Sequence, residues 1–291
     1  MRRFLPSEAK WFASEPPQSD EFTYAPLPPA GRRLVGWRVI PVVAPPLFPL
    51  QFWLTARKLA SNPLARSIPV RQCVSYFGDD LLRYVPPPDG GLVPFARLGK
   101  ARVKLNSRFL DSANWERQTY SLWSFRFDLA REIAAGIPYR ETDTYRLLRD
   151  RMLAGKLNNN RQPLDTEDKL DRYCAYTEWL VESIRRNGMR IRQDAPHLDR
   201  DAFGVVRARN EELEETDIRV AVDENGGFLR LNSGRHRLAV AHALGLAEIP
   251  AQIRLVHVRW LIALTREYGG PPHEALRTWL GRFRSAAPGA S

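Results

Sequence analysis

Residues 228–258 read FLRLNSGRHRLAVAHALGLAEIPAQIRLVHV, and this stretch contains the succession of signals that decides the fold. Residues 228–231 form a short apolar run typical of a strand, and residues 235–244 have the composition of a helix. Gly234 permits a tight turn between them, and residues 249–258 form a further apolar strand. We therefore expect a strand, a turn, a helix and a second strand in this order.

The residues before this stretch complete a β-hairpin. Residues 218–222 read IRVAV and alternate with the period of a strand that has one buried face. The segment Glu224-Asn225-Gly226-Gly227 then supplies turn residues that tolerate positive φ. The sequence thus predicts two antiparallel strands ahead of the helix.

Several earlier stretches have helical periodicity. Residues 115–155 are predicted to form two helices, with Thr142 as the N-cap of the second. A longer amphipathic helix is expected over residues 170–184, and Gly188 is its natural stop. A short helix is also expected over residues 52–60, followed by a loop-rich region with a few short strands, which prolines and glycines interrupt up to residue 91.

These elements predict an α+β fold, with a mostly helical N-terminal portion and a small mixed-sheet domain at the C-terminus. We expect four parts along the chain. They are a proline-rich arm at residues 1–31, a mainly helical region at 32–190, the small sheet domain at 191–262, and a C-terminal helix and tail at 263–291.

Charge is the unusual feature of the composition. The 291 residues include 44 Lys and Arg against 33 Asp and Glu, which gives a formal net charge of +11. An anionic partner is therefore favoured, and nucleic acid, nucleotide, anionic glycan and acidic lipid are all compatible with it. The alternative is a solvated basic surface without a specific partner.

Cysteine usage and hydropathy bear on the compartment. Cys73 and Cys174 are the two cysteines, and they lack metal-ligand spacing, so neither a disulfide framework nor a zinc site is expected. This pattern fits a reduced, cytoplasmic setting. Residues 34–54 are rich in apolar side chains, but four prolines interrupt them, so we expect a packed, extended segment and no transmembrane span.

The turn at Gly234 carries the chemistry of the predicted domain. It would place the backbone amides of Gly234, Arg235 and His236 at a helix N-terminus, where an anion is favoured. Arg235 and Arg237 can each form paired hydrogen bonds to phosphate oxygens, and His236 can donate a hydrogen bond or exchange a proton. A basic helix start that packs on internal carboxylates would have the same sequence.

The run LNSGRHRLAVAHALGLAEIPAQI at residues 231–253 resembles the ParB/sulfiredoxin superfamily, and the resemblance extends from residue 218 to 260. The matching positions are Gly234, His236, Arg237, Leu238, Ala241, Gly245, Ile249 and Pro250. The resemblance implies a ParB/sulfiredoxin-like fold for residues 191–262. It also implies that Ser233, Gly234, Arg235, His236 and Arg237 bind the phosphates of ATP or CTP.

A wider similarity is to ParB-like nuclease-domain proteins with a long N-terminal region. It rests on Asn114-Trp115, on Tyr139-Arg140-Glu141-Thr142 and on His257-Val258-Arg259-Trp260. Two departures limit what the resemblance implies. Ser233 stands where many relatives have Asp, and Arg235 stands where sulfiredoxins have their cysteine, so repair of cysteine sulfinic acid is not expected.

The first functional hypothesis is a nucleotide-binding protein that transfers or hydrolyses phosphate, with Mg²⁺ accompanying ATP or CTP. Its catalytic candidates are His236, Asp217 and Asp223. Candidates for the rim of the site are Glu141, Arg254, His257 and Trp260, and the metal ligands remain unassigned. The second hypothesis is a non-catalytic DNA-binding protein. A nuclease ranks last, because no clustered carboxylates indicate a metal centre.

Overall fold

The computed structural model describes residues 47–92, 95–98, 101–105, 108–115, 119–121, 124–155, 164–191, 218–231 and 234–287. It confirms the predicted α+β class. The predicted arm at residues 1–31 lies outside the described residues. The described chain divides into two units. Unit 1 contains residues 124–155, 164–191 and 234–247, and unit 2 contains residues up to 121, residues 218–231 and residues 248–287.

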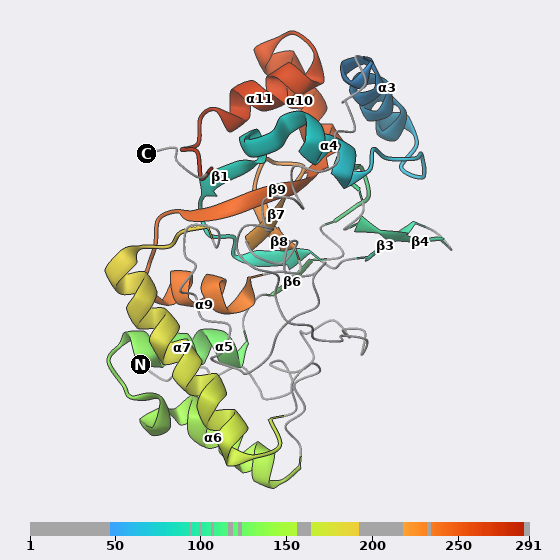
Figure 1. Cartoon of the computed structure of the whole chain (residues 1–291). Coiled ribbons are helices and arrows are strands. Elements are labelled where there is room, and N and C mark those ends of the chain that lie inside the picture. Colours follow the sequence, from blue (N-terminus) through green and yellow to red (C-terminus); the bar gives the residue numbers. More distant parts are fainter. Residues whose placement is uncertain are drawn as a thin grey trace. The chain divides into compact units, whose positions relative to one another are not determined.

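Unit 2 contains a mixed sheet of seven strands (Figure 1). Its strands are β1 (Leu82–Val85), β2 (Gly90–Leu92), β5 (Leu110–Asp111), β6 (Thr119–Ser121), β7 (Ile218–Val222), β8 (Phe228–Leu231) and β9 (Ile249–His257). Their order is β1-β9-β7-β8-β2-β6, and β5 pairs with β9. A separate two-stranded sheet joins β3 (Phe95–Leu98) to β4 (Ala101–Lys104).

The predicted hairpin and final strand are confirmed. β7 pairs antiparallel with β8, with Val222 opposite Phe228, and it pairs parallel with β9 along its other edge. The Glu224–Gly227 stretch forms the connecting turn, in which the Asp223 amide donates a 2.9 Å hydrogen bond to the Gly227 carbonyl. The sequence pattern of residues 218–222 therefore located a true strand, although burial does not alternate along it: four of its five residues are buried and only Arg219 is half-buried.

The sheet also contains four strands from an earlier part of the chain, and the sequence did not predict that they belong to it. β1, β2, β5 and β6 come from residues 82–121, inside the region expected to be mainly helical. Residues 119–121, predicted as helix, are strand and pair with β2. The sequence predicts a few short strands in the loop-rich stretch 63–91, where β1 and β2 lie, but not their place in this sheet. Strands of two to four residues are too short to show a period, and their partners are far away in the sequence.

One core of unit 2 joins both halves of the chain. Its buried members are Leu92, Leu105, Ala113, Trp115, Ala221, Leu231 and Leu255. Four of these residues come from strands β2, β7, β8 and β9, so the core depends on the long-range strand pairing. Burial of apolar side chains contributes roughly 1.5–3 kcal/mol each, which is the main stabilisation available to such short strands.

In its described residues, unit 2 has five further helical elements. They are α3 (Phe48–Ser61), α4 (Val70–Phe77), the 3₁₀ helix η2 (Gly78–Leu81), α10 (Val258–Tyr268) and α11 (Pro272–Leu280). The predicted short helix at 52–60 is thus confirmed as α3, but the expectation of an extended chain up to residue 54 is wrong from Phe48 onward. Pro49 lies in the first turn of α3, where a missing amide hydrogen costs nothing.

Unit 1 is helical in its described residues. It contains α5 (Phe125–Ala134), the 3₁₀ helix η5 (Tyr139–Glu141), α6 (Asp143–Leu153), α7 (Glu167–Asn187) and α9 (Arg235–Ala243). Thr142 caps α6 by accepting a 3.0 Å hydrogen bond from the Tyr145 amide, as predicted. Gly188 follows the end of α7 with a φ of 68°. α9 packs on α5 and α7 (Figure 1).

Among the helices in the described part of the chain, none combines the length and the apolar character needed to cross a bilayer.

Candidate functional site

The turn before α9 has the backbone conformation that the sequence predicts. Gly234 is the N-cap of α9 and has φ 69° and ψ 27°, in the left-handed region. A residue with a Cβ would pay about 1–2 kcal/mol there, which explains the use of glycine. The carbonyl of Gly234 accepts the first helical hydrogen bond, from Leu238, at 2.9 Å. The amides of residues 235–237 have no acceptor within the helix. Ser233 lies outside the described residues.

The side chain of His236 contacts α7. Its Nε2 lies 2.9 Å from the phenol oxygen of Tyr173, and the two rings meet edge to face at 5.3 Å between centroids. Tyr176, almost one helical turn further along α7, also meets the imidazole edge to face, at 5.9 Å. The ring of His236 is therefore held in one orientation by two aromatic side chains.

The two arginines of the turn have different environments. Arg237 is only 8% exposed, and its guanidinium donates a hydrogen bond to the carbonyl of Arg190, just beyond α7. Arg235 is half-buried and is the more exposed residue of the two, although its Nη2 atom is buried. Arg237 thus joins the first turn of α9 to the end of the α7 segment, in addition to any contact with a ligand.

We name the group formed by Gly234, Arg235, His236, Arg237, Tyr173 and Tyr176 the α9 turn cluster. All its members belong to unit 1. The two tyrosines were not predicted as site residues. Tyr173 lies on the apolar face of α7, where a hydroxyl group must find a partner, and that requirement is the only local signal that could have indicated it.

A further arginine lies near this cluster. Arg126, in the first turn of α5, is 5% exposed, and its guanidinium carbon lies 4.7 Å from the centroid of the Phe125 ring. Phe125 in turn lies 6.0 Å from the ring of Tyr173. The sequence did not indicate Arg126, because an arginine at a helix start is usually solvated.

Of the two carboxylates predicted to act in catalysis, one is described. Asp217 lies outside the described residues. Asp223 follows β7, and its Oδ1 accepts hydrogen bonds of 2.8 Å from the amides of both Asn225 and Gly227. These bonds hold the β7–β8 turn in shape, so the observed contacts of Asp223 are those of a turn residue.

His257 has the contacts of a buried helix cap. Its Nδ1 accepts a 3.3 Å hydrogen bond from the Arg259 amide at the start of α10, and its Nε2 lies 3.1 Å from the Ala113 carbonyl. The ring meets Trp115 edge to face at 4.9 Å. Burial lowers the pKa of His257 below the usual range, which favours the neutral ring that these two contacts require.

The remaining rim candidates are dispersed. Trp260 packs on Trp279 at 4.6 Å between ring centroids, and Arg254 donates to the side-chain oxygen of Gln252 at 3.4 Å. Glu141 is an exposed residue of η5 in unit 1. Only the turn residues 234–237 are therefore gathered with other polar side chains in the manner of a binding site.

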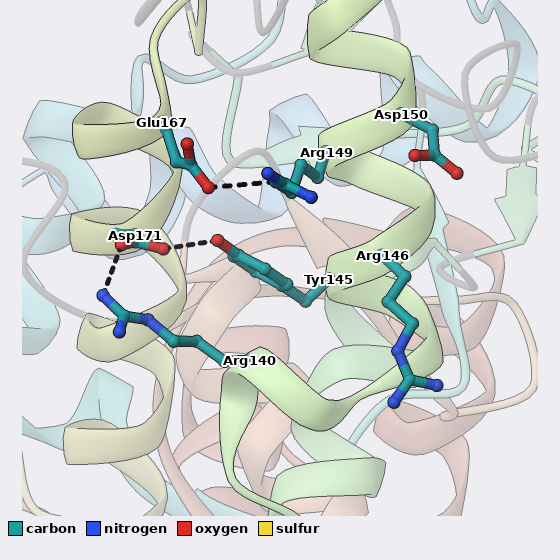
Figure 2. A pocket seen from close by; sticks show the side chains of 7 residues that line it. All are labelled: Arg140, Tyr145, Arg146, Arg149, Asp150, Glu167 and Asp171. Atoms are coloured by element: carbon teal, nitrogen blue, oxygen red, sulfur yellow. Dashed lines mark hydrogen bonds and ion pairs between the residues drawn. The ribbon is translucent and has the colours of Figure 1, made fainter.

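A separate hollow lies between α6 and α7 (Figure 2). Its polar residues are largely paired with one another. The hydroxyl of Tyr145 donates to Asp171 at 2.6 Å, Arg140 donates to the same carboxylate at 2.7 Å, and Arg149 donates to Glu167 at 2.9 Å. Burial and the Asp171 carboxylate raise the pKa of the Tyr145 hydroxyl well above its usual range. These polar contacts therefore link η5 and α6 to α7.

Within the described residues, no three or more His, Cys, Asp or Glu side chains are grouped in a way that could hold a metal ion. No family model, curated protein or solved structure matches the chain.

Proposed function

We propose that this chain binds ATP or CTP and that the nucleotide phosphates occupy the α9 turn cluster. The observation that carries the proposal is the left-handed Gly234, which leads directly into a helix whose first turn bears Arg235, His236 and Arg237. Helix amides and adjacent guanidinium groups together favour a doubly charged oxyanion. The resemblance of this turn to the ParB/sulfiredoxin superfamily supports the same ligand.

From their contacts, we infer different roles for the three side chains. Arg235, as the more accessible arginine, would bind a phosphate oxygen directly. Arg237, held by the Arg190 carbonyl, would keep the turn in place and add positive charge. Because Nε2 of His236 is engaged with Tyr173, a hydrogen bond from His236 to phosphate would be made through Nδ1.

Such a site would serve phosphoryl transfer to an acceptor or hydrolysis by water. In this chemistry the protein contributes mainly positioning and charge neutralisation, and it need not supply the nucleophile. Mg²⁺ would enter with the nucleotide phosphates. His236 is the candidate for proton transfer within the described residues.

The test is nucleotide binding by the purified full chain. Isothermal titration with ATP and with CTP, each with and without Mg²⁺, should show saturable binding of one of them. Arg235→Gln should weaken that binding by about tenfold or more, the value of a charged hydrogen bond to phosphate. Arg186→Gln is the matched control, because Arg186 is an exposed arginine of α7 in the same unit and pairs with Glu182.

Two results would overturn the proposal. One is the absence of saturable binding of either nucleotide by the wild-type chain. The other is equal binding by the Arg235→Gln and Arg186→Gln variants. If a nucleotide does bind, release of inorganic phosphate under the same conditions distinguishes hydrolysis from binding alone.

The net charge of +11 favours DNA binding as the second candidate function. It predicts that a labelled duplex binds with an affinity that decreases steeply with salt, and that nucleotides neither bind nor turn over.

A further inference from the structure

Helix α3 has an apolar face that points to solvent. Leu47, its N-cap, is 65% exposed, and Leu50, Trp53 and Leu54 are 52%, 39% and 39% exposed. The helical period places Leu47, Leu50 and Leu54 in one stripe. Water is a poor partner for several large apolar side chains in one place, and such a patch indicates an interaction surface.

The opposite face of α3 is fully packed. It buries Phe48, Phe52, Ala56 and Leu59, and the rings of Phe52 and Phe77 lie 5.7 Å apart. α3 also packs on α10 and α11, in the same unit (Figure 1). The exposed leucines therefore do not contribute to the core, and we expect the fold to tolerate their substitution.

Basic residues follow the apolar stripe along the chain, with no acidic residue in the same segment. From Leu47 to Gly78 the sequence has no Asp or Glu, and its four cationic residues are exposed. These are Arg57, Lys58, Arg66 and Arg71. Arg57 and Lys58 lie one turn beyond Leu54 on the same side of α3, and the guanidinium of Arg57 is 5.6 Å from the centroid of the Trp53 ring. The patch thus combines leucines, an exposed indole and uncompensated positive charge.

We propose that the outer face of α3 binds the surface of an anionic membrane. In this arrangement α3 lies in the plane of the interface. Leu47, Leu50 and Leu54 enter the boundary between headgroups and acyl chains, and Trp53 lies at headgroup level. Arg57 and Lys58 contact lipid phosphates. Leucine and tryptophan on one side with flanking basic residues are the features of helices that lie on membranes.

The charges favour this partner over a second copy of the chain. Self-association through α3 would leave Arg57 and Lys58 of each copy without a carboxylate from the 47–78 segment of the other, because this segment has none. A lipid surface with negative headgroups supplies the missing countercharge.

Co-sedimentation of the full chain with vesicles tests the proposal. We expect binding to vesicles of phosphatidylcholine mixed with phosphatidylglycerol, and much less to phosphatidylcholine alone. The double variant Leu50→Gln/Leu54→Gln should partition about tenfold or more weakly, because it removes two apolar side chains from the interface. The double variant Arg57→Gln/Lys58→Gln should lose about fivefold per charge at low salt.

Leu153→Gln is the matched control, since Leu153 at the end of α6 is 69% exposed and lies in unit 1. It should bind vesicles as the wild type does. Circular dichroism melts of every variant show whether the fold is retained.

The proposal is overturned if the wild-type chain does not bind anionic vesicles, or if a folded Leu50→Gln/Leu54→Gln variant binds them as tightly as the wild type. It is also overturned if sedimentation equilibrium shows a dimer that this variant abolishes while no vesicle binding occurs. In that case the face is a contact between two copies.

Discussion

The phenol oxygen of Tyr173 lies 2.9 Å from Nε2 of His236, and this contact joins the middle of α7 to the first turn of α9 across 63 residues of sequence. Both side chains are at least partly buried. The orientation of the imidazole at the Gly234 turn is therefore determined by a helix that lies far away in the chain.

Tyr173→Phe should keep the ring packing of this contact and remove the hydroxyl. We expect a loss of about 1 kcal/mol in the free energy of unfolding, the net value of one hydrogen bond. Urea denaturation measures it. In a double-mutant cycle with His236→Ala, the coupling energy should be about 0.5 kcal/mol or more, and strictly additive losses would show that the two side chains do not interact.

Gly226→Ala should destabilise unit 2 through a clash in the β7–β8 turn. Gly226 has a φ of 85°, and a Cβ at this position would lie 2.7 Å from Nε1 of the buried Trp260. The cost is backbone strain of about 1 kcal/mol plus the displacement of a packed indole, for a total of about 2–4 kcal/mol.

Gly245→Ala is the control for the strain alone. Gly245 has a φ of 64°, and a Cβ there would meet no atom within 4 Å. Its thermal unfolding midpoint should decrease less than that of Gly226→Ala. Equal decreases would mean that Trp260 is not fixed against the turn.

Asp111→Asn should be strongly destabilising even though it preserves shape. Asp111 is fully buried and accepts hydrogen bonds from Arg108, from the Ala113 amide and from Nε1 of Trp115. An asparagine would direct its NH₂ group toward at least one of these donors. We expect a loss of about 3 kcal/mol, measured by chemical denaturation.

Asp143→Asn provides the comparison for this charge removal. Its carboxylate is 64% exposed and pairs with Arg146 at 3.2 Å. The change should cost about 0.5 kcal/mol or less, because exposed ion pairs contribute little. A similar loss for Asp111→Asn would mean that the buried carboxylate is not needed.

The stability of the chain should decrease in mild acid through His257. Burial lowers the pKa of this imidazole, so below pH of about 6.5 the unfolded chain takes up a proton more readily than the folded one. The stabilisation is complete above about pH 6.5 and is lost as the pH falls through the folded-state pKa. Burial also lowers the pKa of His273, which acts in the same direction.

His257→Gln should therefore weaken the pH dependence of the unfolding free energy between about pH 7 and about pH 5. His273→Gln should remove a separate part of it. If the dependence in His257→Gln equals that of the wild type, the imidazole is not kept neutral by burial.

Much of the local structure could be predicted from the sequence. The β7–β8 hairpin, the Thr142 cap, the end of α7 before Gly188 and the turn at Gly234 all lie where the sequence predicts them. Each depends on a few neighbouring residues whose backbone preferences or side-chain period are strong.

The candidate site could be predicted only in part. The sequence predicted that residues 234–237 form the turn and start of a helix, but it did not indicate Tyr173 and Tyr176, because their contact with His236 depends on how α7 packs on α9. Asp223 was predicted as a catalytic residue and His257 as a residue of the site rim, and both predictions rested on residue type and position along the chain. The structure engages them in a turn and a helix cap, respectively.

The sequence by itself determined the hairpin, the glycine turn and the basic helix start, because short-range backbone preferences and periodicity are properties of adjacent residues. Only the tertiary structure decided that β1, β2, β5 and β6 join the same sheet and that Trp115 meets His257. Such contacts depend on the complementarity of surfaces formed by distant segments, and a local pattern does not specify its partner.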